Sequence, residues 1–185
     1  MPCCNSLTTK HGYVETFDHI DLLPSGRSLV YSFRVGDSAQ PEGVLCEEAV
    51  EAIDGTRLCP LPDVPLWHAG LLMYRDTPLP VIDLSRLLYA RSHEGARNVI
   101  VVRHANELLG LLVDELADVP EFAASRILPI DELVTSQRAA LLDRAVRPEQ
   151  GDDPILMILN IGRLFEYVTA ATDISGGFPE QGQIA

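Results

Sequence analysis

Four cysteines and five histidines are the side chains of this 185-residue chain best suited to bind a metal ion. Cys3 and Cys4 are adjacent near the start of the chain, whereas Cys46 and Cys59 each stand alone, so no pair has the spacing of a zinc site. We interpret Cys46 and Cys59 as small core residues. The histidines are scattered and none has a second ligand type beside it, so we expect no bound metal.

Local motifs give no support for catalysis. The sequence has no glycine-rich phosphate loop, no Gly-x-Ser-x-Gly elbow and no His-Glu-x-x-His. Asp114 and Glu115 are adjacent acids, but neighbouring residues of a strand point to opposite faces, so the two carboxylates cannot converge on one bond. We therefore predict a protein that is not an enzyme, needs no cofactor and works through its surfaces.

Arg75 is the charged side chain whose setting is most informative. It lies between two apolar runs of strand length, Leu71 to Tyr74 and Leu79 to Ile82. Polar residues between two such runs predict a hairpin, with Arg75-Asp76-Thr77-Pro78 at its tip. A residue at a hairpin tip is not expected in the core, so this arginine should be available to a partner.

Prolines and a carboxylate define the elements that follow Arg75. Pro78 and Pro80 lack an N–H group, so the second strand should lie at a sheet edge or leave its ladder unfilled on one side. Asp83 precedes Leu84, Leu87 and Leu88, which have helical spacing, and therefore predicts the cap of a short helix.

Short runs of strand character occur along most of the chain. They are Leu29 to Val35, Val99 to Val102, Leu108 to Val113, Ile127 to Pro129, Leu141 to Val146 and Ile155 to Leu159. The first alternates like a half-buried strand, the second is β-branched like a buried one, and Gly110 predicts a bulge or a close backbone approach. The residues from Cys59 to Trp67 contain three prolines and predict a braced connection that ends in a buried tryptophan. Asn160 should cap an amphipathic C-terminal helix.

Four stretches in this order resemble the CheW-type coupling domain of bacterial chemotaxis. They are the apolar-aromatic strand that stops at Gly36, the segment from Gly70 through Arg75 to Pro80-Val81-Ile82-Asp83-Leu84, the Gly110 to Asp114 segment, and the strand that leads into Asn160-Ile161 and a helix. Val50 and Ile53 match the family's Val-x-Glu-Val or Val-x-Glu-Ile signature. Its third position is Ala52 here, with Glu51 beside it, and this departure puts in doubt any contact the family makes through that glutamate.

The resemblance implies a mainly β fold of two five-stranded SH3-like barrels packed together, with short helices that include a C-terminal one. The expected division is an N-terminal tail over residues 1–27, the CheW-like domain over 28–170 and a C-terminal tail over 171–185. The first barrel would take residues 28–88 and part of the C-terminal segment, and the second about 98–160, with the polar stretch Tyr89 to Asn98 crossing between them.

The resemblance also implies the function and the site. A CheW-type protein is an adaptor that binds the regulatory domain of a CheA-type histidine kinase and, in the groove between the barrels, the cytoplasmic tip of a methyl-accepting chemoreceptor. The partner-binding residues implied here are Arg75, Asp76, Val50, Glu51 and Ile53. Asp76 stands where the family usually has glycine and could partly neutralise Arg75.

Composition and length narrow the alternatives. The net charge of −13 argues against nucleic acid and anionic membrane as partners. No apolar run could span a bilayer and no leader is visible, so we expect a cytoplasmic protein without membrane insertion. The length leaves no room for a kinase's ATP-binding domain. An accessory scaffold of a non-flagellar pathway (surface sensing, pilus motility or second-messenger control) remains an alternative, and so does a small-molecule or nucleic-acid-binding barrel.

Overall fold

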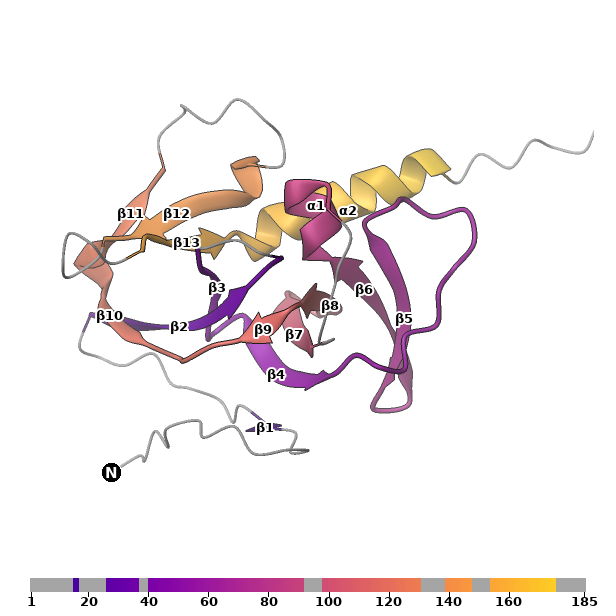
Figure 1. The fold of residues 1–185 in the computed structure, drawn as a ribbon, viewed down its shortest axis with the longest axis horizontal. Helices are drawn as coiled ribbons and strands as arrows, with labels where there is room; N and C mark the ends of the chain where they lie inside the picture. The colour runs from indigo at the N-terminus through magenta and orange to yellow at the C-terminus, as the bar shows by residue number, and fades with distance from the viewer. Residues whose placement is uncertain are drawn as a thin grey trace, which may run out of the picture.

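The computed structural model describes residues 15–16, 26–36, 40–91, 98–130, 139–147 and 154–175, with the backbone alone for residues 15–16, 139 and 172–175. These residues form a mainly β fold of two sheets with two α-helices, as predicted (Figure 1). Most of both expected tails, including Cys3 and Cys4, lies outside the described residues. No helix of the described part is long and apolar enough to cross a membrane.

The first sheet has six strands in the order β1-β4-β7-β8-β6-β5, and only the β6–β8 pairing is parallel. The strands are β1 (Glu15–Thr16), β4 (Ala49–Asp54), β5 (His68–Tyr74), β6 (Thr77–Asp83), β7 (Asn98–His104) and β8 (Glu107–Val113). Helix α1 (Leu84–Tyr89) follows β6 directly, and the Asp83 carboxylate caps it by accepting a hydrogen bond from the Arg86 N–H at 3.0 Å. The predicted cap is therefore confirmed.

The two prolines of β6 occupy positions where no hydrogen-bond donor is required. Pro80 lies opposite Leu71 of β5, whose N–H and C=O both point outward and bond to Cys59 at 2.8 Å. Pro80 therefore belongs to a non-hydrogen-bonded pair, and its nitrogen faces the β8 side. Pairing with β8 begins only at Val81, so the ladder beside Pro78 and Pro80 is unfilled, as the sequence predicted.

The second sheet has seven strands, with the path β10-β2-β3-β13-β12-β11 and with β9 paired to β2. The strands are β2 (Arg27–Arg34), β3 (Glu42–Leu45), β9 (Glu115–Leu116), β10 (Glu121–Ala123), β11 (Ile127–Pro129), β12 (Leu142–Val146) and β13 (Leu156–Leu159). The two ends of the path, β10 and β11, are joined by the single 3₁₀ turn η1 (Ala124–Arg126). The sheet must therefore curl back on itself, as a small barrel does.

The strands are divided between the sheets differently from the expected barrels. Strands β2 and β3 belong to the second sheet rather than the first, and β7 and β8 belong to the first rather than the second. The stretch Tyr89 to Asn98 consequently joins α1 to β7 within one sheet, although residues 92–97 lie outside the description. From β2 onward, the chain changes sheets instead at the turn 46–48 and at Asp114.

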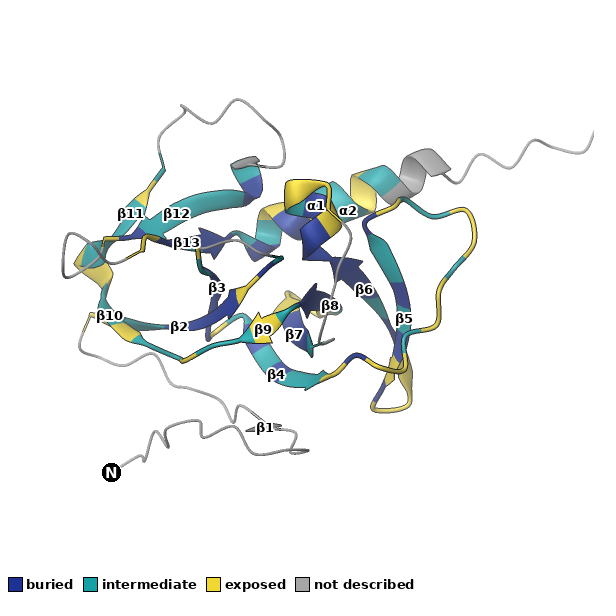
Figure 2. Ribbon diagram, viewed as in Figure 1, coloured by how far each residue is buried: buried dark blue, intermediate teal, exposed yellow. Residues whose placement is uncertain are grey.

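The largest hydrophobic cluster lies between the two sheets, and smaller clusters fill the inside of each. Strand β2 contributes to two of them: Tyr31 and Phe33 face the cluster between the sheets, as does Val35 just after the strand, whereas Val30 faces the inside of the second sheet. The expectation of a half-buried β2 is therefore wrong, because both of its faces meet apolar side chains. Residues 30–33 of the strand are all buried (Figure 2). Trp67 is 8% exposed, and this confirms the predicted buried tryptophan.

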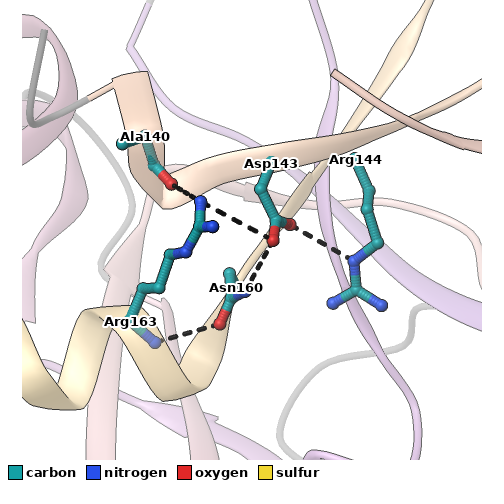
Figure 3. Close-up of polar contacts among 5 residues, drawn as sticks. All are labelled: Ala140, Asp143, Arg144, Asn160 and Arg163. Carbon is teal, nitrogen blue, oxygen red and sulfur yellow. Dashed lines mark hydrogen bonds and ion pairs between the residues drawn. The ribbon is translucent and has the colours of Figure 1, made fainter. Parts of the chain in front are cut away.

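Helix α2 (Ile161–Ser175) joins the two halves of the molecule. Asn160 caps it by accepting from the Arg163 N–H at 2.9 Å, and its own side-chain N–H donates to Asp143 of β12 at 2.6 Å (Figure 3). The Tyr167 ring lies 6.0 Å from the Trp67 ring, before β5. The predicted cap is confirmed, and the helix continues to Ser175, although we expected the C-terminal tail to begin at residue 171.

Two glycines and a cysteine show how tightly strands of the first sheet pack. A Cβ on Gly110 of β8 would lie 2.8 Å from Val99 and 2.9 Å from Val81, so the predicted close approach is present. Gly70 has a φ of +137°, and a Cβ there would lie 2.3 Å from the Cys59 carbonyl oxygen. Cys46 is buried as expected. Cys59 is exposed, so its prediction as a core residue is wrong, because its backbone pairs with the outer edge of β5.

Candidate functional site

The hairpin tip between β5 and β6 is tighter than the sequence suggested. Tyr74 pairs with Thr77, so only Arg75 and Asp76 form the turn, and Thr77 and Pro78 belong to β6. Arg75 has a φ of 46° and Asp76 a φ of 63°. A two-residue turn with two positive φ values matches the right-handed twist of the flanking strands. Both residues of the turn therefore have a left-handed backbone.

A β-bulge in β4 decides where the Glu51 side chain points. The register with β7 shifts between Ala49, opposite Val102, and Glu51, opposite Val101. Val50 is the extra residue, so the alternation of inward and outward side chains is reset after it. Glu51 consequently shares the inner face of the first sheet with Val101, while Ala52 packs against the cluster between the sheets.

Glu51 is 3% exposed and receives two donors from the hairpin. The Tyr74 hydroxyl and the Arg75 guanidinium both donate to its Oε1, the latter from Nη2 at 2.9 Å. Three strands separate β4 from β5 in the sheet order, and a flat sheet would hold them about 19 Å apart. The first sheet therefore curls until these two strands face each other, and Glu51 bridges the opening.

Tyr74 supports Arg75 in two ways. Its hydroxyl shares the Glu51 carboxylate, and its ring lies 5.1 Å from the guanidinium carbon, within the range of a cation–π interaction. Burial, the hydrogen bond to Glu51 and the charge of that carboxylate raise the pKa of Tyr74 to about 12. The phenol therefore remains a proton donor throughout the neutral range, and it holds Glu51 in place.

Arg75 remains largely in solvent despite these contacts, with 61% of its side chain exposed. A guanidinium has five N–H donors in a planar fork, and Glu51 accepts from one of its nitrogens. The outward donors can form directional hydrogen bonds to a carboxylate or a carbonyl of another protein. This arrangement can bind a partner, but it contains no pair of groups set up for proton transfer.

The other expected site residues have different positions. Val50 and Ile53 are half-buried and pack against Tyr74, Leu79 and Val101, so they support the hairpin from inside. Asp76 is exposed at the tip, and the Arg75 ion pair is made with Glu51. The structure therefore brings Glu51, Arg75 and Asp76 to one end of the first sheet and places Val50 and Ile53 beneath them.

Tyr74 is the residue that the sequence reasoning missed. It was assigned only as the last residue of an apolar strand, although its hydroxyl gave a signal: a buried tyrosine usually finds a hydrogen-bond partner. Among the described residues, no group of three histidine, cysteine, aspartate or glutamate side chains could hold a metal ion. The polar cluster of Glu51, Tyr74 and Arg75 is thus the candidate site, and its chemistry is that of recognition.

Comparisons with known proteins agree with this fold. The family model of the CheW-like domain matches residues 30–169. The chain is 32% identical over 117 residues to the chemotaxis protein CheW of Rhizobium meliloti (strain 1021), a match that covers 62% of this chain and 73% of that protein. It is 31% identical over 114 residues to the probable chemotaxis protein CheW of Rhizobium etli, covering 60% and 72%.

A solved structure shows the same architecture. The crystal structure of the scaffolding protein TtCheW from Thermoanaerobacter tengcongensis superposes with a TM-score of 0.65 at 20% identity, covering 75% of this chain and 92% of that one. At this identity the likeness concerns the fold. The family model spans most of the chain, from β2 to α2, and includes every residue of the candidate site. The chain belongs to the CheW-like domain family.

Proposed function

We propose that this chain is a non-catalytic adaptor that couples methyl-accepting chemoreceptors to a CheA-type histidine kinase in a bacterial chemosensory array. Family membership and the names of the two rhizobial relatives support this role. The observation that carries it for this chain is the exposed guanidinium of Arg75, held at a hairpin tip by the buried Glu51 carboxylate. An exposed guanidinium that can bind another protein suits a scaffold that acts in the cytoplasm.

The geometry supports Arg75 as the residue that contacts a partner. Glu51 and the Tyr74 ring restrict the rotamers of the arginine before any partner arrives, which lowers the entropy cost of binding. The regulatory domain of the kinase is the partner we assign to this end of the first sheet. The cytoplasmic tip of the receptor would bind in the groove between the two halves.

An accessory scaffold of a non-flagellar pathway is the second candidate. Asp76 favours it, because this residue adopts a φ of 63° at the position where the family usually has glycine. An exposed carboxylate next to Arg75 changes the charge of the surface and would suit a partner with a basic group there. Such a partner would belong to a diverged array serving surface sensing, pilus motility or second-messenger control.

The experiment compares two arginines of similar exposure. Arg75→Ala should weaken binding to the kinase regulatory domain by about 1 to 3 kcal/mol, as for a hot-spot arginine, and should lower the melting temperature modestly, because the buried Glu51 carboxylate loses its cation but keeps the Tyr74 hydroxyl. Arg163→Ala is the matched control: its side chain is 53% exposed, but it belongs to the cluster at the start of α2. Calorimetric titration with the kinase domain and with a receptor-tip fragment gives both affinities.

Equal affinities of wild type and Arg75→Ala for both partners would reduce Arg75 to an ordinary solvated charge. Weaker binding by Arg163→Ala, at an unchanged Arg75→Ala affinity, would place the interface at the start of α2 instead. A loss of affinity confined to one partner assigns the hairpin tip to that partner.

A further inference from the structure

Glu42 is a buried carboxyl group at the junction of the two sheets. It is the first residue of β3 and has no solvent exposure. Its neighbours across the ladder are Phe33 of β2 and Met157 of β13, both apolar. A carboxyl group without access to water normally needs a full set of partners, since burying a charge without them is costly.

One oxygen of this carboxyl group has a partner and the other has none. The Tyr89 hydroxyl donates to Oε1, whereas Oε2 has no hydrogen-bond partner among the described residues. Tyr89 ends helix α1, which follows β6 and packs against β6 and β8 of the first sheet. The hydrogen bond therefore links the first sheet to the second through α1, which lies at their junction (Figure 1).

No cation balances Glu42 within the described structure. The arginines on the elements packed against it are engaged elsewhere: Arg27 pairs with Glu121, Arg34 with Glu115 and Arg86 with Asp83. The other titratable residue of β2, Tyr31, lies opposite Val44, and β13 has no titratable residue. Tyr89 is thus the one titratable group that the structure shows bonded to Glu42.

We propose that Glu42 and Tyr89 form a pH-sensitive contact between the two sheets, closed while the carboxyl group is neutral and loosened when it ionises. A neutral carboxyl group can remain buried with one oxygen lacking a donor. An ionised one needs further donors, which only water can supply here. Tyr89 is 37% exposed, so a small displacement of its ring would admit water and separate the end of α1 from β3.

The pKa of Glu42 indicates that the contact loosens near neutral pH. Burial raises the pKa of Glu42 from 4.5 to about 7, and the Tyr89 hydrogen bond lowers it by a smaller amount. Below this pH the contact is closed. Between pH 6 and pH 8 the ionised fraction rises from about one tenth to about nine tenths, so the loosened form should increase about tenfold in population.

A second carboxyl group with similar acidity supplies the control. The pKa of Glu48 is also raised to about 7 by burial, but this residue lies near Arg144 and Asp143, and its N–H bonds to Leu45 at the opposite end of β3 from Glu42. Global stability alone would therefore not separate the two groups. The test needs a local readout at Glu42, α1 and β3.

Carbon-13 NMR of the glutamate carboxyl groups, with Glu42 assigned from the Glu42→Gln spectrum, should give a Glu42 midpoint near pH 7. Amide hydrogen exchange of α1 and β3, corrected for its intrinsic pH dependence, should accelerate about tenfold from pH 6 to pH 8. Glu42→Gln should remove this acceleration and Glu48→Gln should retain it. A Glu42 midpoint below 5, or an acceleration that persists in Glu42→Gln, would overturn the proposal.

Tyr89→Phe keeps the test decisive if Glu42→Gln fails to fold. It removes the donor that favours the ionised carboxylate, so the Glu42 midpoint should move to higher pH. A midpoint that is unchanged or lower in Tyr89→Phe would show that the two side chains do not act together. Neither measurement depends on the partners of the adaptor.

Discussion

Two clusters of arginine and carboxylate, one at the β5–β6 hairpin tip and one where β12 meets the start of α2, use the same groups differently. In the Glu51 cluster, Tyr74 and Arg75 of a hairpin share one buried carboxylate oxygen. In the Asp143 cluster, Asn160 and Arg163 at the start of α2 both contact the Asp143 carboxylate, and Arg163 also donates to the Ala140 carbonyl at 3.0 Å (Figure 3).

Exposure does not distinguish the two arginines, because 61% of the Arg75 side chain and 53% of the Arg163 side chain are in solvent. The difference lies in what each cluster holds together. Arg163 joins α2 to β12 and to the preceding 3₁₀ turn, η2 (Ala139–Leu141). Arg75 lies beyond the last pair of a hairpin, and Tyr74 already bridges that hairpin to β4. Arg75 is therefore available to bind a partner, because Tyr74 already holds the hairpin to β4.

The most damaging test of this comparison places a second acid beside Glu51. Val101→Asp introduces a carboxylate directly opposite Glu51, at a position without solvent exposure. We expect a loss of more than about 4 kcal/mol in the free energy of unfolding, since two buried like charges cannot both be paired. Urea denaturation measures this loss, with Val101→Ala as the control for volume. If Val101→Asp melted within two degrees of wild type, water would have to reach the inner face of the first sheet.

Removing each carboxylate compares the clusters directly. Glu51→Ala leaves the Tyr74 hydroxyl, on a side chain that is 7% exposed, without its acceptor, and we expect a cost of about 2 to 3 kcal/mol. Asp143→Ala should cost about 1 to 2 kcal/mol, because the Asp143 side chain is 19% exposed and water can replace it. Denaturant titrations of both variants decide the order. A larger loss in the free energy of unfolding for Asp143→Ala than for Glu51→Ala would contradict this order.

The clusters should also respond to different pH ranges. Beside the Asp143 cluster, burial raises the pKa of Glu48 from 4.5 to about 7. The folded chain then keeps a proton that the unfolded chain loses, so the free energy of unfolding falls as the pH rises through this range. Glu48→Gln should reduce that fall between pH 5 and pH 8 by about 2 kcal/mol, leaving the similar contribution of Glu42.

The Tyr74 hydroxyl makes the Glu51 cluster sensitive to alkali. The pKa of Tyr74 is about 12 in the folded chain and near 10 in the unfolded one, so its contribution declines as the pH rises above 10. Unfolding curves of wild type and Glu48→Gln at several pH values test both statements. Parallel curves from pH 5 to pH 8 would contradict the assignment to Glu48.

The smallest expected effect concerns the strained turn. Asp76→Gly should raise the free energy of unfolding by a few tenths of a kcal/mol, because glycine adopts a φ of 63° without steric cost but loses more backbone entropy on folding. Asp76→Ala should lower it, since alanine tolerates the left-handed region less well than aspartate. Midpoints of urea denaturation distinguish the two signs. Equal midpoints for both variants would mean that the turn is not strained.

Local features were predictable from the sequence. The caps at Asp83 and Asn160, the hairpin around Arg75 and the buried strand from Val99 to Val102 all follow from patterns within one turn or one strand. The groups that form a helix cap or a hairpin turn are only a few residues apart and meet in any fold that contains these elements. The local sequence is therefore enough to predict them. The family resemblance added the mainly β architecture.

The sequence by itself thus determined the two helix caps, the hairpin and the exposure of Arg75, whereas the tertiary structure decided which sheet each strand joins and which face Glu51 occupies. Strand pairing depends on partners far along the chain, so β2 and β7 could not be assigned to sheets from their own residues. One extra residue in β4 resets the alternation of inward and outward side chains along that strand. The carboxylate of Glu51 therefore points into the first sheet and meets Arg75, a contact that the residue order around Ala52 had put in doubt.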